Sequence, residues 1–209
     1  VHLREELFAP VGHATADGRN HHVARQEVTG GHGLHITPSA AQSKTEKLHW
    51  LDHEYLKKMP AAELGTRLTP YLARAGIATA GGPDVSRLAE LLRDRCATLV
   101  AMADAARVYY QRPGIDAALW QQHFTEAARP AIDALPAALA GLAWDRASLG
   151  TAIKALVASH GLKMPQVMMP LRIALTGQAQ SPSVDAVMET LGREETLTRV
   201  RAALAPSAR

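Results

Sequence analysis

The chain has 209 residues, of which 47% are apolar and 21% are charged, and its formal net charge is +3. This length corresponds to one domain or two small ones, and the apolar residues after about residue 45 exclude a disordered polar tail. The small number of aromatic residues argues against a β-sandwich or barrel, and a single cysteine excludes a disulfide framework within the chain. No apolar run is long enough to span a membrane. We therefore expect a mostly helical, cytoplasmic protein that does not bind membranes.

The N-terminal region differs in composition from the rest of the chain. Gly, Thr and Pro interrupt every helical periodicity in residues 1–30, which we predict to be an irregular or disordered extension. Eight of the ten histidines lie within residues 2–53. His49 and His53 have the four-residue spacing of a zinc-binding pair, but the Glu of an H-E-x-x-H motif is missing. We interpret them as solvated helix residues and predict no metal site.

Helical periodicity begins at about Lys44 and continues almost to the end of the chain. In the first part, Leu64, Leu68 and Leu72 recur at four-residue steps. Gly81–Pro83 forms a break, which predicts two helical lobes at residues 31–80 and 81–209. The helices that we expect cover residues 44–59, 61–75, 84–110, 116–129, 130–142, 145–161, 165–175, 182–191 and 193–205. Pro136 is predicted to kink or shorten the fifth of them.

Residue spacing does not indicate a catalytic centre. The chain contains no G-x-S-x-G, G-x-x-x-x-G-K-[ST] or G-x-G-x-x-G motif. Cys96 follows Arg95, which could lower the pKa of its thiol, although a lone helical cysteine is more often a small core residue. We predict no catalytic residue in this chain.

Several arginines and one polar loop are suited to nucleic-acid recognition. Arg93, Arg95, Arg172 and Arg193 lie at predicted helix starts or bends. Guanidinium groups donate hydrogen bonds to phosphates and base edges and stack on unpaired bases. The loop Thr176–Ser183 carries hydroxyl and amide groups that could contact bases in the same way. Without further knowledge, surface arginines and an ordinary interhelical loop are the favoured interpretation, because loops and charged faces are common.

The order of several motifs resembles the bacterial glutamyl-tRNA synthetases. These motifs are KLHWLDHEYLK at residues 47–57, LRDRCATL at 92–99, the Tyr109-Tyr110 pair, PLRIALTG at 170–177 and SPS…LGRE at 181–194. They recur in the family's order over about residues 31–205. In that family the corresponding region is an all-α, two-lobed helical bundle that binds the anticodon. The resemblance implies a lobe that contacts the tRNA stem at residues 31–80 and an anticodon-binding domain at 81–209.

The resemblance also implies roles for particular residues. Arg95 would read the first anticodon base, with Arg93 as the alternative if the register of the match is shifted. Arg172, together with the turn formed by Ser181, Pro182 and Val184, would contact the second and third bases. Anticodon bases are unpaired, so their edges are accessible to side chains, as this assignment requires. A helix-packing ion pair is the alternative role for Arg172.

The family's catalytic signatures are missing from this sequence. Its members attach glutamate to tRNA with ATP and Mg²⁺ on a doubly wound domain that carries HIGH and KMSKS motifs, and neither motif occurs here. We therefore expect a cofactor-free, monomeric chain that binds the anticodon arm of tRNA(Glu) and is inactive by itself. It could be an expressed domain, a truncated gene product or one half of a split enzyme. The competing interpretation is a helical protein-interaction domain without an RNA function.

Overall fold

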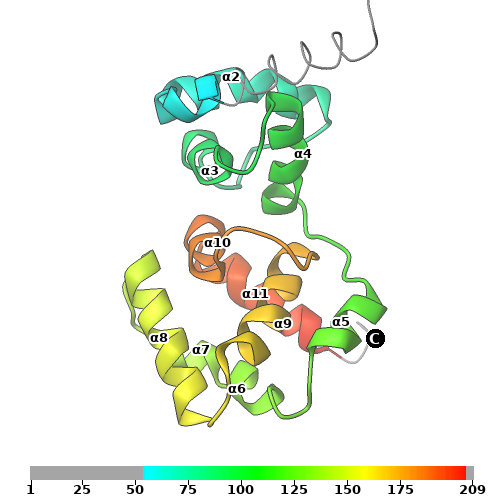
Figure 1. The fold of residues 1–209 in the computed structure, drawn as a ribbon, viewed down its shortest axis with the longest axis vertical. Coiled ribbons are helices and arrows are strands. Elements are labelled where there is room, and N and C mark those ends of the chain that lie inside the picture. Colours follow the sequence, from blue (N-terminus) through cyan, green and yellow to red (C-terminus); the bar gives the residue numbers. More distant parts are fainter. Residues whose placement is uncertain (1–53, 206–209) are drawn as a thin grey trace, which may run out of the picture. The chain divides into compact units, whose positions relative to one another are not determined.

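The computed structural model describes residues 54–205, and Figure 1 shows that this part of the chain contains helices and no strands. A short helical segment at residues 54–58 is followed by ten helices. Their bounds are α2 Ala61–Arg74, α3 Val85–Leu92, α4 Leu99–Tyr110, α5 Ala117–His123, α6 Arg129–Asp133, α7 Leu135–Ala138, α8 Arg146–Ser159, α9 Met164–Thr176, α10 Val184–Leu191 and α11 Arg193–Leu204. The predicted all-α class is confirmed.

Helices α2, α3 and α4 pack against one another at the N-terminal end of the described residues. The predicted leucine stripe of α2 is fully buried at Leu64, Leu68 and Leu72, and burying each leucine contributes about 1.5–3 kcal/mol. Gly65 allows α2 and α3 to approach closely, because a Cβ atom at this position would lie 2.8 Å from the Cα atom of Ser86. The helix predicted for residues 61–75 is confirmed.

The single helix predicted for residues 84–110 is wrong, because the chain forms two helices with a turn at residues 93–98. Asp84 caps α3 as predicted, since its Oδ1 atom accepts a hydrogen bond from the Arg87 amide at 2.9 Å. The hydroxyl of Thr98 accepts one from the Ala101 amide at 3.1 Å and thereby starts α4. Leu92 and Leu99 are seven residues apart and both pack on the core, so the periodicity continues across the turn.

Cys96 lies in this turn rather than on a helix, and its side chain is buried. Burial raises the pKa of its thiol, and the nearby guanidinium of Arg95 opposes that shift without reversing it. The lowered pKa that the sequence allowed is therefore not found. The thiol belongs to the hydrophobic core.

The central helices are shorter than the sequence predicted. The helix expected at 116–129 ends at His123, and the one expected at 130–142 is split into α6 and α7. The second change agrees with the disturbance predicted at Pro136, which stands in the first turn of α7. Asp145 caps α8 as predicted, accepting a hydrogen bond from the Ser148 amide at 2.9 Å. Helix α9 continues through Pro170.

Helix α10, orange in Figure 1, packs against α3 and also against α8, α9 and α11. It therefore connects the group formed by α2, α3 and α4 to the helices that follow. A buried arginine on α11 adds a second connection. Arg199, only 4% exposed, donates from Nη1 to the carbonyl oxygens of Val108 and Leu175, each at 2.6 Å. Its Nε atom donates to Glu195 at 2.7 Å, so its buried charge is paired. Arg199 therefore joins the last turns of α4 and α9.

Some predictions concern residues that the structure does not describe, namely the extension at residues 1–30 and the pair His49 and His53. The predicted division into lobes at residues 80 and 81 stays a prediction. None of the helices within residues 54–205 is both long and apolar enough to cross a bilayer. The same residues contain no cluster of three or more His, Cys, Asp or Glu side chains suited to a metal ion.

Candidate nucleic-acid interface

A groove with a volume of about 270 Å³ lies between the α3–α4 turn, helix α4 and the loop that follows α9. We call it the Arg95 groove. It brings together Arg95, Ser181 and Pro182, three of the residues that the sequence predicted as contacts of the anticodon. The residues that line it are Leu92, Arg95, Cys96, Ala105, Val108, Tyr109, Thr176, Gln178, Gln180, Ser181 and Pro182.

The guanidinium of Arg95 is available to a ligand. Arg95 is exposed to solvent. Its backbone amide donates a hydrogen bond to the Leu92 carbonyl at 2.9 Å, which stabilises the turn. Its side chain makes no hydrogen bond or ion pair within residues 54–205. A guanidinium carries five N–H donors, so Arg95 presents a full set of donors at the edge of the groove.

The opposite wall of the groove is a loop that is shaped by its own hydrogen bonds. Gly177 ends α9 with a φ of 68°, and a Cβ atom at this position would lie 2.8 Å from the Gly114 carbonyl oxygen. The Thr176 hydroxyl donates to the Arg172 carbonyl at 2.8 Å and accepts from the Gln178 amide at 3.3 Å. The exposed residues Gln178 and Gln180 extend from this framework, with side chains that can both donate and accept.

Arg172 lies behind this loop and is not among the residues that line the groove. Its Nη1 atom donates to the Ala179 carbonyl at 3.4 Å and contacts the Met169 sulfur at 3.7 Å, while its Nε atom is buried without a partner. Arg172 forms no ion pair within residues 54–205, so the alternative of a helix-packing ion pair is not found there. In this structure it supports the loop from within.

Two other predicted residues contribute to the fold rather than to the surface of the groove. Val184 is 0% exposed at the start of α10 and is not among the residues that line the groove, so its side chain can position the loop from below. Arg93 donates from Nη1 to the carbonyls of Lys57 and Met59 at 3.1 and 3.3 Å. It also pairs with Glu90 at 3.3 Å. Because Arg93 is engaged in these contacts, the geometry favours Arg95 over the alternative register.

Sequence reasoning assigned no role to Tyr109, which also lines the groove. Its hydroxyl is buried and has no hydrogen-bond partner within residues 54–205. Burial raises its pKa, against the lowering effect of Arg95 and Arg199. The neighbouring Tyr110 points elsewhere, and its hydroxyl donates to the Pro83 carbonyl at 3.0 Å. Adjacent residues of a helix point about 100° apart, so the sequence alone could not show which tyrosine faces the groove.

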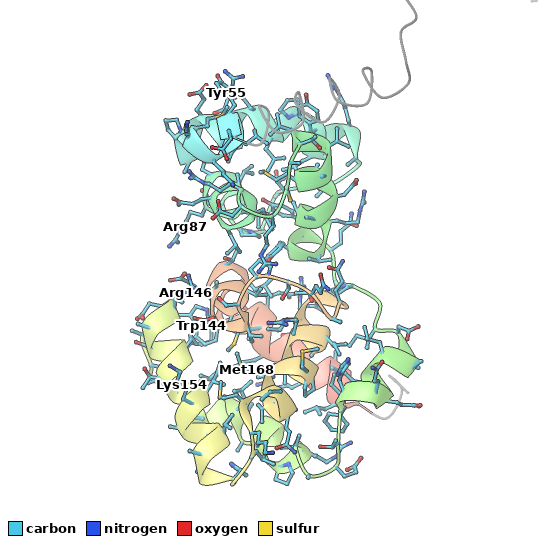
Figure 2. All side chains as sticks on the ribbon, viewed as in Figure 1. Tyr55, Arg87, Trp144, Arg146, Lys154 and Met168 are labelled. Atoms are coloured by element: carbon cyan, nitrogen blue, oxygen red, sulfur yellow. The ribbon has the colours of Figure 1, made fainter. Side chains whose placement is uncertain are left out.

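A larger cavity of about 540 Å³ lies between α3, α8 and α10 and is a poorer candidate for nucleic acid. Arg87 and Arg146, labelled in Figure 2, both line it. Four carboxylates also line it, and Arg146 already binds Asp185 and Ser183 at 3.0 Å. The acidic residues of this cavity are Asp84, Glu90, Asp94 and Glu189. Carboxylates outnumber guanidiniums here, so the cavity disfavours phosphate groups.

The chain is similar to known proteins over most of its length. The family described as "Anticodon binding domain" matches residues 45–204. The glutamate–tRNA ligase of Thiobacillus denitrificans is 44% identical over 170 residues, which are 81% of this chain and 36% of that protein. The glutamate–tRNA ligase of an Azoarcus species is 46% identical over 166 residues, which are 79% of this chain and 36% of that protein. The chain thus spans little more than a third of the length of these curated relatives.

A solved structure shares the fold. The crystal structure of a glutamate tRNA ligase from Elizabethkingia meningosepticum, in complex with its amino acid, superposes with a TM-score of 0.69. The superposition covers 76% of this chain and 32% of that one, at 24% sequence identity. Because the family match extends over most of the sequence, from residue 45 to residue 204, this chain belongs to the anticodon-binding domain family.

Proposed function

We propose that this chain recognises the anticodon of a glutamate tRNA, as one portion of a glutamate–tRNA ligase. The observation that carries the proposal is the Arg95 groove, where a guanidinium without a partner among residues 54–205 faces a loop that presents two amide side chains. Unpaired bases are recognised by such donors and acceptors on their exposed edges. The similarity to glutamate–tRNA ligases supports the choice of tRNA.

The size of the groove limits what it can hold. Its volume of about 270 Å³ lies just below the range of about 300–1,000 Å³ that is typical of small-molecule pockets. This space suits a single base better than three neighbouring ones. We assign the first anticodon base to the groove, where Arg95 would donate to the acceptors of its edge.

The other predicted residues would either contact the next base or keep the loop in shape. Ser181 and Pro182 would contact the next base from the wall of the groove, while Arg172 and Val184 would keep the loop in the required shape. The Ser181 hydroxyl donates to the Pro182 carbonyl at 2.8 Å, and Arg172 holds Ala179, so the loop is already ordered without RNA. A site that is ordered before binding loses less conformational entropy when the ligand arrives.

The chemistry of the parent reaction belongs to a part of the enzyme outside this sequence. We propose that ATP and Mg²⁺ bind there and that this chain positions the tRNA for glutamate attachment. It acts where tRNA is used, in the cytoplasm, and we propose that it is a monomer. Supplied alone with ATP, glutamate and tRNA, the chain is expected to form no glutamyl-tRNA.

Fluorescence anisotropy with a labelled anticodon stem-loop of a glutamate tRNA tests the proposal. The full chain should bind this RNA more tightly than a stem-loop of identical stem and replaced anticodon. Affinity should fall steeply with added salt, because contacts with phosphates release counterions. The competing function, a protein-interaction domain, predicts no preference for the anticodon. Equal affinity for both stem-loops would contradict the proposal.

A further inference from the structure

One buried polar group beside the Arg95 groove is unused by the fold. Tyr109 lies in the last turn of α4 and is 4% exposed, and its hydroxyl has no hydrogen-bond partner within residues 54–205. Buried hydroxyl groups in folded proteins are nearly always hydrogen-bonded, since leaving one without a partner destabilises the fold. A phenylalanine would pack the same ring without this disadvantage. The Tyr109 hydroxyl therefore has no role in stabilising the described fold, and a role in binding a ligand would explain its presence.

Tyr109 borders two cavities in the part of the chain that the structure describes. Tyr109 lines the Arg95 groove together with Arg95 and Ser181. Its ring also borders a second cavity of about 500 Å³, on the side of Arg199. The position of Tyr109 is fixed, because Arg199 binds the carbonyl of the preceding residue, Val108, at 2.6 Å. The backbone beside Tyr109 is thus held in place before any ligand arrives, and its buried ring packs in the core.

The chemistry of the Tyr109 hydroxyl indicates which chemical group of a ligand it could bind. A tyrosine hydroxyl is protonated at neutral pH, so the group can donate a hydrogen bond, and burial raises the pKa of Tyr109 further. The buried ring offers no open face for stacking. A phosphate would have to lose its hydration to reach so deep a position, whereas the edge of a planar base carries neutral acceptors.

We propose that the Tyr109 hydroxyl donates a hydrogen bond to an acceptor on the edge of the base that enters the Arg95 groove. Tyr109 is then a specificity-determining residue at the floor of the groove, and Arg95 acts at its mouth. This inference rests on the proposed function, since it requires an unpaired base in the groove. It adds a contact that the sequence motifs did not indicate.

Two single-atom deletions on neighbouring residues test the inference. Tyr109→Phe removes a hydroxyl without a partner, so the free energy of unfolding in urea should stay at the wild-type value or rise. Its affinity for the anticodon stem-loop should fall about tenfold, as expected for one lost buried hydrogen bond. Tyr110→Phe is the matched control, because its hydroxyl binds the Pro83 carbonyl. This control should lower the stability and leave the RNA affinity of the folded protein unchanged.

The possible outcomes separate the inference from the proposed function. Wild-type RNA affinity in Tyr109→Phe, combined with weaker binding by Arg95→Gln, would overturn the role of Tyr109 alone. A loss of stability in Tyr109→Phe would overturn it as well, since the hydroxyl would then serve the fold. If the wild-type chain shows no preference for the anticodon, the proposed function and this inference both fail.

Discussion

The two walls of the Arg95 groove differ in how far their polar groups are used within the fold. On the α9 side, Thr176 and Arg172 hold the loop through hydrogen bonds to nearby backbone atoms. On the α3–α4 side, Arg93 is tied to the carbonyls of Lys57 and Met59, while Arg95, two residues later, makes no such contact. The α9 wall is a loop held by its own hydrogen bonds. The α3–α4 wall ends in the Arg95 guanidinium, which has no hydrogen-bond partner among residues 54–205.

This difference shows how arginines of equal charge take separate roles in one small domain. Arg193 donates to the carbonyls of Leu139 and Leu142, and Arg199 to those of Val108 and Leu175. Both bind carbonyl groups at or beyond the ends of helices, where such groups lack intrahelical partners. An arginine that has no such carbonyl nearby is left for a ligand. Arg95 is the candidate RNA contact because it combines two properties: it has no partner within the described residues, and it lines the groove.

The largest expected effect on stability comes from Arg199, which connects the α4 and α9 sides of the groove. Replacing Arg199 by Met should lower the free energy of unfolding by about 3–5 kcal/mol, because Glu195 loses a buried partner and two carbonyls lose their donor. Urea denaturation measures this change. Arg112→Met is the matched control, since Arg112 reaches the same Glu195 from solvent with a side chain that is 61% exposed. A stability loss in the control equal to that of Arg199→Met would contradict the role of Arg199.

The α9 wall is tested at its glycine. Gly177→Ala should destabilise the protein by about 1–3 kcal/mol, because the new Cβ atom combines a positive φ with a 2.8 Å approach to the Gly114 carbonyl oxygen. Gly161→Ala is the control, with a similar φ of 64° and open space around the new atom. It should cost only about 1 kcal/mol, the conformational penalty alone. Equal losses in urea denaturation would show that the close approach does not constrain the loop.

A smaller effect is expected from acid. Hydrogen bonds from Arg112 and Arg199 hold the pKa of Glu195 below its ordinary value of 4.5. A lowered folded-state pKa stabilises the protein at pH values above 4.5, and this contribution is lost as the pH falls through the lowered value. Glu195→Gln should therefore lose less stability than the wild type as the pH falls from 4.5 through that lowered value. Glu194→Gln, at an exposed neighbouring position, should behave like the wild type.

The helical part of the fold was largely predictable because local signals determine it. The leucine stripe of α2 and the capping residue Asp145 define their helices without help from distant contacts. The turn at residues 93–98 was missed because leucines on both sides of it stay in phase with a continuous helix. Thr98, a capping residue in the middle of the stretch predicted as one helix, was the signal that could have shown the break.

The site was less predictable because it depends on contacts between distant residues. Motif order singled out Arg95, Arg93 and the loop around Ser181, but the sequence could not separate the two arginines. What separates them is the position of the Lys57 and Met59 carbonyls, more than 30 residues earlier in the chain. The same applies to Tyr109, whose lack of a partner is a property of the packed structure.

A double-mutant cycle between Arg95 and the first anticodon base tests the central claim most directly. The four affinities are those of wild type and Arg95→Gln for the stem-loop with the native first base and with that base replaced. Arg201→Gln, at an exposed arginine without partners in the described residues, controls for the loss of one positive charge. We expect a coupling energy of about 1–3 kcal/mol for Arg95 and none for Arg201. Coupling energies of zero at both positions would contradict the reading of the first base by Arg95.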